Sequence, residues 1–244
     1  MAEWEPYEAD LDAITVTRFS LRQRVQHEIL VGSFVVLILT GLPVLFPRIS
    51  TSLLGGVFAI RTFLHHFAGV VLIALSVYHI VYLAFSAEGR RDFVGMLPRW
   101  RDVTDLIDFV KYHIGRSDEH PQFDKFDPFE KFEYLAVVWG SGVMIVSGLM
   151  MWFFEFTLRF FPKWVYDLIV MVHGYEAILA FLAVILGHLY NVHLKPEVFP
   201  MSRVWLDGQI TLRQMKEHHP REYERWLREQ RIQRTREADA PPAS

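Results

Sequence analysis

The sequence contains no cysteine. This absence excludes disulfide bonds, cysteine-ligated iron–sulfur clusters, thiol nucleophiles and the covalent attachment of haem through a C-x-x-C-H motif. The N-terminus is acidic and lacks the basic region and apolar run of a cleavable signal peptide. A large net charge is also lacking, at −3, so the distribution of charge among segments is more informative than the total. Any iron bound by this chain must be held non-covalently, by histidine.

Apolar residues, by contrast, make up 52% of the chain, which contains 20 Phe, 9 Tyr and 7 Trp. This content is high for a soluble domain and indicates one membrane-embedded unit with polar ends. We therefore predict an all-α membrane protein, a four-transmembrane-helix bundle. The four apolar runs long enough to cross a bilayer lie at about residues 27–46, 63–85, 132–156 and 165–193.

Polar segments divide the rest of the chain. Residues 1–17 form an N-terminal arm expected to lie on a partner or on the membrane surface, residues 18–200 hold the bundle, and residues 201–244 form a helical tail. In the long connection between the second and third runs, apolar residues recur at helical spacing from Val103 to Ile114. This periodicity predicts an amphipathic helix lying in the membrane interface.

Lys and Arg residues concentrate before the first run, between the second and third runs, and in the tail. The positive-inside rule therefore places both termini and the long connection in the cytoplasm. We expect a multi-pass protein of the bacterial inner membrane, in contact with membrane lipids and with no nucleic-acid partner.

Histidines lie near both ends of the fourth run, at His173 and His188. On a regular helix these two residues are within roughly 60° of one another and about 22 Å apart along the axis. A single histidine in a span is as often a hydrogen-bonded core residue as a functional one, although ionisable residues there are costly. Here the depths match across helices: His65 opens the second run at the depth of His173, and His27 opens the first at that of His188.

Two haem b groups, each with two histidine ligands from different helices, account for this pattern. The expected axial ligands are His65 with His173 for the outer haem, and His27 with His188 for the inner haem. His79 also lies at the inner depth, so it is an alternative inner ligand, a propionate partner or part of a quinone or proton path. A haem-free membrane anchor or proton-conducting bundle, in which the histidines form relays, is the alternative of another class.

Short motifs accompany these histidines along the chain. They are His27 with Thr40-Gly41, Leu64-His65-His66-Phe67-Ala68-Gly69, Lys125-Phe126-Asp127-Pro128-Phe129-Glu130-Lys131, Phe161-Pro162 with His173 and His188-Leu189-Tyr190, and Lys216-Glu217-His218-His219-Pro220-Arg221-Glu222-Tyr223. In these motifs the chain resembles the cytochrome b (gamma) subunit of respiratory formate dehydrogenases over roughly residues 18–228. It is more weakly similar to the b-type cytochrome of nickel–iron hydrogenases.

The resemblance implies the same two ligand pairs and a quinone site beside the inner haem. In that family an inner fourth-span histidine and an asparagine line the site, and they correspond to His188 and Asp127. Glu130 stands at a glutamine position, and Asp127, Glu130 and His193 are the candidates for the quinone and proton site. The His173–His188 spacing is one residue longer than is usual in the family, which predicts a local bulge or a shifted helix.

The expected function is electron transfer without a catalytic domain, because the polar segments are too small to form one. Electrons would pass between menaquinone or ubiquinone and a periplasmic oxidoreductase. Its expected subunits are a catalytic subunit and an iron–sulfur or multihaem cytochrome c electron-transfer subunit. The resemblance implies a formate dehydrogenase-like complex; a hydrogenase, another molybdoenzyme or a multihaem cytochrome c is the alternative partner of the same module.

Overall fold

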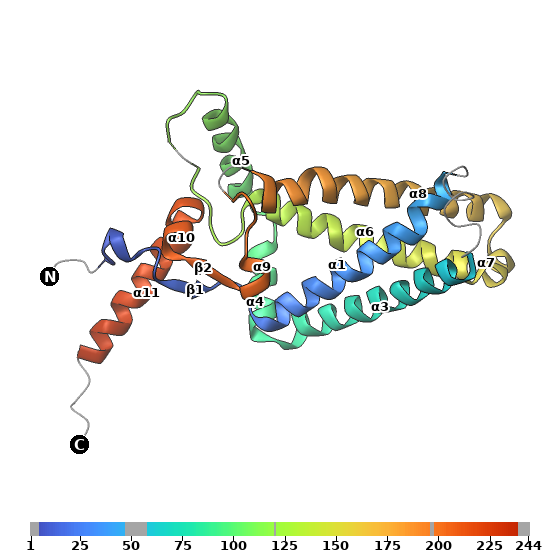
Figure 1. The fold of residues 1–244 in the computed structure, drawn as a ribbon, viewed down its shortest axis with the longest axis horizontal. Helices are drawn as coiled ribbons and strands as arrows, with labels where there is room; N and C mark the ends of the chain where they lie inside the picture. The colour runs from blue at the N-terminus through green and yellow to red at the C-terminus, as the bar shows by residue number, and fades with distance from the viewer. Residues whose placement is uncertain (1–4, 47–57, 120, 196–197, 239–244) are drawn as a thin grey trace, which may run out of the picture.

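Four long apolar helices form an elongated bundle with both chain termini at one end (Figure 1). The computed structural model describes residues 5–46, 58–119, 121–195 and 198–238. The mainly helical class and the four predicted spans are confirmed. The bundle elements are α1 (Leu21–Gly41) with the 3₁₀ turn η2 (Leu42–Leu45), α3 (Phe58–Phe85), α6 (Pro128–Trp152), the short α7 (Phe154–Phe160) at the end opposite the termini, and α8 (Lys163–Leu182) with the π-helical η3 (Ala183–His188) and η4 (Tyr190–Leu194).

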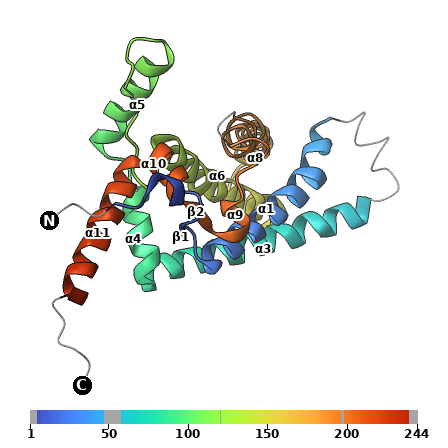
Figure 2. The same ribbon diagram turned by 60° about the vertical axis from the view of Figure 1, so that its left-hand side comes forward.

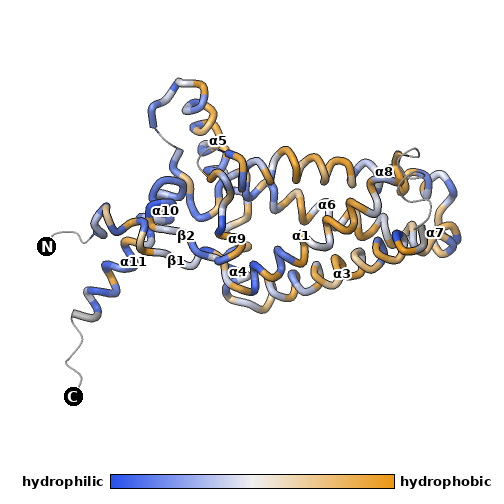
Figure 3. The backbone as a smooth tube through the Cα atoms, in the orientation of Figure 1, coloured by the Kyte–Doolittle hydropathy of each residue, from blue (hydrophilic) through white to orange (hydrophobic). Residues whose placement is uncertain are grey.

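Most apolar side chains of the bundle point outward and not into a protein core. Phe63, Trp139 and Leu186 are 67%, 73% and 69% exposed. The bundle is hydrophobic along its length, whereas the end that carries the termini is largely hydrophilic (Figure 3). Lipid tails cover such a surface in a membrane, where the helices satisfy their own backbone hydrogen bonds.

Two spans begin earlier than their apolar runs because polar residues cap them. At the start of α1, the backbone N–H of Ser20 donates to Gln23 Oε1 at 2.9 Å. At the start of α6, Asp127 Oδ1 accepts from the backbone N–H of Glu130 at 2.7 Å, and Glu130 Oε2 accepts from the N–H of Asp127 at 3.0 Å. These capping boxes satisfy N–H groups for which the first helical turn provides no partner.

The helices pack as two pairs, α1 against α3 and α6 against α8. Glycines on α6 let α8 approach closely. A Cβ atom added at Gly148 would lie 3.2 Å from His173 Cε1, and one at Gly140 would lie 2.9 Å from Glu176 Oε1. The small residues of the third span therefore serve helix packing, as their abundance in the sequence indicates.

The fourth span changes helix type as it approaches the end with the termini. Its first part, α8, is regular, and it continues as the π-helical η3 and η4. A π-turn holds more residues than an α-turn, so it accommodates an extra residue within a helix. The bulge that the His173–His188 spacing predicts therefore lies in η3, immediately before and at His188.

The described segments outside the bundle gather at the end with the termini, and we call them the polar cap (Figure 2). The amphipathic helix predicted from Val103 to Ile114 is present as α5, whereas α4 was not anticipated from the sequence. The cap elements are η1 (Glu8–Asp10), β1 (Thr15–Thr17), α4 (Ala87–Met96), α5 (Trp100–His113), α9 (Val204–Asp207), β2 (Gln209–Thr211), α10 (Leu212–His218) and α11 (Pro220–Ala238).

The N-terminal arm packs against the tail of its own chain. β1 and β2 pair antiparallel, with Val16 opposite Ile210. Leu11 and Leu212 are 1% and 0% exposed in the small core that results. The arm can close this core because its few apolar residues meet those of the tail. The core residues are Leu11, Ile210, Leu212, Met215, Tyr223 and Leu227.

Charged pairs of low exposure join the cap to the bundle and the cap helices to one another. Lys131, in the first turn of α6, donates to Asp102 of α5 at 2.6 Å. Arg221 of α11 holds Asp105 of α5 through two hydrogen bonds of 2.7 and 2.8 Å. Because these acidic residues face the protein, the apolar face of α5 points outward. Val103 is accordingly 50% exposed.

Candidate functional site

Two pairs of histidines face one another across the bundle, one pair near each end. The far pair consists of His65 of α3 and His173 of α8, with ring centroids 6.5 Å apart and planes inclined by 66°. The cap-side pair consists of His27 of α1 and His188 of η3, with centroids 6.3 Å apart and planes inclined by 51°. The structure thus brings together the two predicted pairs, each from different helices.

The separation of the rings suits a single iron atom between them. A bond of about 2 Å from iron to each nitrogen, plus roughly 1.2 Å from nitrogen to ring centre, places two coordinated imidazoles about 6.4 Å apart. Both pairs match this value. Among the described residues, no group of three or more His, Asp or Glu side chains is arranged to hold a metal ion. Two-histidine sites of this kind suit haem, whose porphyrin supplies the other four ligands.

Hydrogen bonds determine which nitrogen of His65 is free for a metal. Thr40 Oγ1 donates its one hydrogen to the backbone carbonyl of Val36, 2.6 Å away, and lies 2.9 Å from His65 Nδ1. The hydroxyl must therefore accept from His65 Nδ1–H, since its own hydrogen is used. The lone pair of His65 is then on Nε2, which leaves that nitrogen available to bind a metal.

His173 has the same arrangement on the other side of the far pair. Ser147 Oγ donates to the carbonyl of Val143 at 2.6 Å and lies 2.8 Å from His173 Nδ1. The hydroxyl again accepts from the ring, which leaves Nε2 of His173 with its lone pair. Both rings of the far pair are therefore fixed in orientation and in tautomer by an acceptor on a neighbouring helix, α1 for His65 and α6 for His173.

His188 of the cap-side pair is held by a carboxylate instead of a hydroxyl. His188 Nδ1 donates to Glu133 Oε2 at 2.9 Å, and Asn191 Nδ2 donates to Glu133 Oε1 at 3.2 Å. Its partner His27 has a buried Nδ1 with no hydrogen-bond partner among the described residues. The two ends of the bundle therefore differ in the groups that surround the histidines.

Close approach of the backbone leaves space for the far pair. A Cβ atom at Gly41 would lie 2.9 Å from His65 Cε1, which is closer than side-chain atoms approach one another. At Gly32 and Gly69, an added Cβ would meet no heavy atom within 4 Å. Glycine is thus required at position 41 by the ring of His65, and the other two leave open space beside the helices.

His79 has both ring nitrogens engaged in hydrogen bonds. Gln26 Nε2 donates to the carbonyl of Arg22, so Gln26 Oε1 accepts from His79 Nδ1–H at 2.9 Å. The phenol of Tyr134 then donates to His79 Nε2 at 3.1 Å. This set of contacts is that of a polar residue with satisfied hydrogen bonds inside the bundle.

Asp127 and Glu130 lie together at the start of α6 as the two halves of its capping box. Glu130 Oε1 also lies 3.3 Å from Arg18 Nη2, which bonds the carbonyl of Lys125 as well. Burial and the neighbouring charge of Glu130 raise the pKa of Asp127 to about 7. The raised pKa favours the protonated form of Asp127 more than in an ordinary carboxyl.

His193 lies one turn beyond His188, near Trp205 of α9. The centroid of the Trp205 ring is 6.4 Å from that of His193 and 6.2 Å from that of His27. The Nδ1 atom of His193 and Nε1 of Trp205 are buried without a hydrogen-bond partner among the described residues. Trp205 thus lies between His193 and His27 of the cap-side pair. Asp127 and Glu130 instead contact one another at the start of α6, and Glu130 also contacts Arg18.

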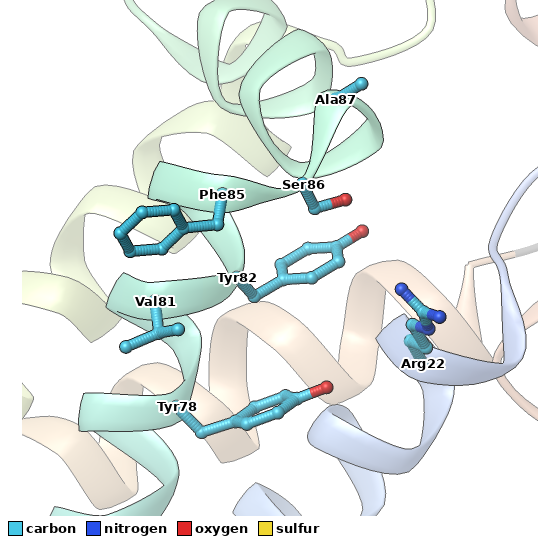
Figure 4. A pocket seen from close by; sticks show the side chains of 7 residues that line it. All are labelled: Arg22, Tyr78, Val81, Tyr82, Phe85, Ser86 and Ala87. Atoms are coloured by element: carbon cyan, nitrogen blue, oxygen red, sulfur yellow. The ribbon is translucent and has the colours of Figure 1, made fainter.

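A groove of about 460 Å³ opens where α1 and α3 meet the cap (Figure 4). The rings of Tyr78 and Tyr82 lie one above the other along α3, and Arg22 faces them from α1. None of the paired histidines lines this groove, so it is separate from both pairs. The lining residues are Arg22, Tyr78, Val81, Tyr82, Phe85, Ser86 and Ala87.

Several residues beside the histidines were missed in the sequence. Glu133 carried a usable signal, because an acidic residue inside an apolar run is costly and marks a functional position. Ser147 carried none, because serine is common in the spans as a packing residue. Thr40 stood in a motif, but its contact with His65 depends on how α1 and α3 pack.

Comparison with known proteins gives a consistent result. The family model for prokaryotic cytochrome b561 matches residues 18–205. The chain is 24% identical over 227 residues to a formate dehydrogenase cytochrome b556 subunit of Haemophilus influenzae, covering 91% of this chain and 86% of that protein. It is 25% identical over 224 residues to the formate dehydrogenase cytochrome b556(fdo) subunit of Escherichia coli K12, covering 89% and 94%. It is 22% identical over 216 residues to the nitrate-inducible b556(Fdn) subunit of that organism, covering 88% and 91%. The resemblance drawn from the motifs is confirmed.

Proposed function

The chain belongs to the prokaryotic cytochrome b561 family, and from this we propose that it is the membrane cytochrome b subunit of a formate dehydrogenase-like complex. Curated relatives with that role match most of its length. In this proposal the chain carries electrons between a periplasmic oxidoreductase and the quinone pool. Its partners are a catalytic subunit and an electron-transfer subunit, because the cysteine-free chain supplies no iron–sulfur cluster of its own.

In this proposal His65 with His173 would hold one haem b, and His27 with His188 would hold the other. The observation that carries this assignment is the 6.3 and 6.5 Å ring separations. When bound, haem b supplies one-electron chemistry at each end of the bundle. Thr40, Ser147 and Glu133 hold three of the four rings with Nε2 free, and His79 is assigned a structural role because both its nitrogens are bonded.

The quinone site is proposed at the cap-side end of the bundle. His188 and His193 lie on consecutive π-helical segments there, and Trp205 connects His193 with His27. Asp127 and Glu130 are the proposed path for protons into this end, because burial and the neighbouring charge of Glu130 raise the pKa of Asp127 well above that of an ordinary carboxyl. The chain itself would bind the quinone, orient it and exchange its protons.

The polar cap is proposed to face the cytoplasm of a bacterial cell, so that both termini are cytoplasmic. Its support is the concentration of Lys and Arg in the cap segments, as the positive-inside rule expects. On this orientation the far pair is the outer pair, and the electron-transfer partner docks at the end that carries α7. The exposed apolar face of α5 is proposed to lie in the membrane interface.

Purification of the chain with its native partners tests this function. We expect two haems per chain by pyridine haemochrome analysis. Addition of formate should reduce these haems and produce the absorbance of low-spin ferrous haem b. His173→Ala and His188→Ala should each lower the content by one haem. His113→Ala is the matched control, because this histidine is exposed on α5 and should leave both haems bound. A haem-free preparation, or unchanged content in both variants, would contradict the proposal.

A further inference from the structure

The acceptors that hold the paired histidines differ in charge between the two ends of the bundle. At the far end, Thr40 and Ser147 are neutral hydroxyls whose hydrogens are already donated to backbone carbonyls. At the cap-side end, the acceptor for His188 is the carboxyl group of Glu133. The imidazole ligands at the two sites therefore differ in electron density. The rings of His65, His173 and His188 nevertheless have the same tautomer, with the hydrogen on Nδ1.

Two contacts fix the Glu133 side chain in position. Its Oε2 accepts from His188 Nδ1 at 2.9 Å and its Oε1 accepts from Asn191 Nδ2 at 3.2 Å. His188 and Asn191 are three residues apart, so they face α6 together. A Cβ atom at Gly187 would lie 3.9 Å from Glu133 Oε1, so η3 passes this carboxylate at van der Waals distance. Both oxygens of Glu133 are thus engaged in hydrogen bonds to residues of the fourth span.

A carboxylate acceptor changes the chemistry of the imidazole that it holds. It draws the Nδ1 hydrogen toward itself, which makes the ring a stronger electron donor through Nε2. A stronger donor stabilises oxidised iron over reduced iron and lowers the reduction potential. A hydroxyl that only accepts a neutral hydrogen bond has a smaller effect.

We infer that Glu133 is a positioning residue that lowers the reduction potential of the cap-side haem through its hydrogen bond to His188. This inference rests on the proposed function, because it assumes iron between His27 and His188. The Glu133 side chain is only 27% exposed, so solvent screens its charge incompletely. The carboxylate thereby makes the two haems of one chain electrochemically distinct.

Spectroelectrochemical titration of the purified complex tests this inference with Glu133→Gln. The glutamine oxygen can still accept from His188 Nδ1–H, so both haems should remain bound. The midpoint potential of one haem should shift in the positive direction while that of the other stays unchanged. Glu224→Gln is the matched control, since this acidic residue is exposed on α11, outside the bundle, and should move neither potential.

The outcomes separate this inference from the proposed function. Two haems with unchanged potentials in Glu133→Gln would overturn the role of Glu133 and leave the function standing. An unsubstituted protein without haem would overturn the function itself. If Glu133→Gln loses a haem, Glu133→Asp must restore it with a potential near the original, because it keeps a carboxylate. Failure of Glu133→Asp to do so overturns the inference.

Discussion

Arg18 lies at the junction of the arm, the tail and the bundle, and its replacement tests how the polar cap is held. Its side chain is 4% exposed and lies 3.1 Å from Glu222 of α11 and 3.3 Å from Glu130 of α6. It also bonds the carbonyl of Lys125. Arg18→Met keeps the aliphatic length of the side chain and removes the charge. Two carboxylates would then lose their cation at once.

The expected cost follows from the exposure of each partner. Breaking a buried ion pair by removing one member costs about 3–5 kcal/mol. The Glu130 side chain is 37% exposed and that of Glu222 is 15% exposed, so solvent recovers part of this loss. We therefore expect about 2–3 kcal/mol, which corresponds to roughly 30- to 160-fold in an opening equilibrium. The loss should fall on the cap and not on the spans, which pack separately.

Hydrogen exchange of the full chain in detergent measures this opening locally. Backbone amides of β2, α10 and α11 should exchange faster in Arg18→Met by the factor above, while amides of α3 and α8 remain protected. Arg228→Met is the matched control, because Arg228 pairs with Glu224 on the exposed surface of α11, at 3.9 Å. Such a pair contributes well under about 1 kcal/mol. Equal exchange in the two variants would refute the reasoning.

Three further predictions concern haem binding at the far pair, the pH dependence of cap stability and the packing of the cap core. Ser147→Ala leaves Nδ1–H of His173 without its acceptor and should weaken haem binding at the far pair by about 10- to 100-fold. Haem retention during dilution measures this change, and undiminished retention would show that the hydrogen bond from His173 to Ser147 does not support haem binding. Burial and the charge of Arg18 lower the pKa of His219 to about 4, from an ordinary value of 6.5. The unfolded cap therefore binds a proton that the folded cap does not, and cap stability should fall as pH drops from about 6.5 to about 4, whereas His219→Gln should flatten this dependence. Leu212→Ala, at a position 0% exposed in the cap core, should cost about 2–5 kcal/mol of cap stability by the same exchange measurement; a loss below about 1 kcal/mol would show that the arm and tail do not share a core.

The junction of arm and tail shows where reading the sequence reaches its limit. Residues 1–17 read as polar, and nothing local indicates that Val16 pairs with Ile210 nearly two hundred residues later. The same holds for Glu133 and His188, which lie on different spans. The helical spacing of α5 was readable, but the ion pairs that turn its acidic face toward the protein were not. Such contacts depend on packing between distant segments.

The sequence by itself determined the features that depend on length and periodicity. Apolar runs long enough to cross a bilayer defined the four spans, the absence of cysteine excluded cysteine-ligated iron, and helical geometry put His173 and His188 on one face. Only the tertiary structure decided which groups hold these rings, because a hydrogen bond requires atoms placed within about 3 Å. It placed neutral hydroxyls at the far pair and a carboxylate at the cap-side pair, and it put the extra residue of the fourth span into η3.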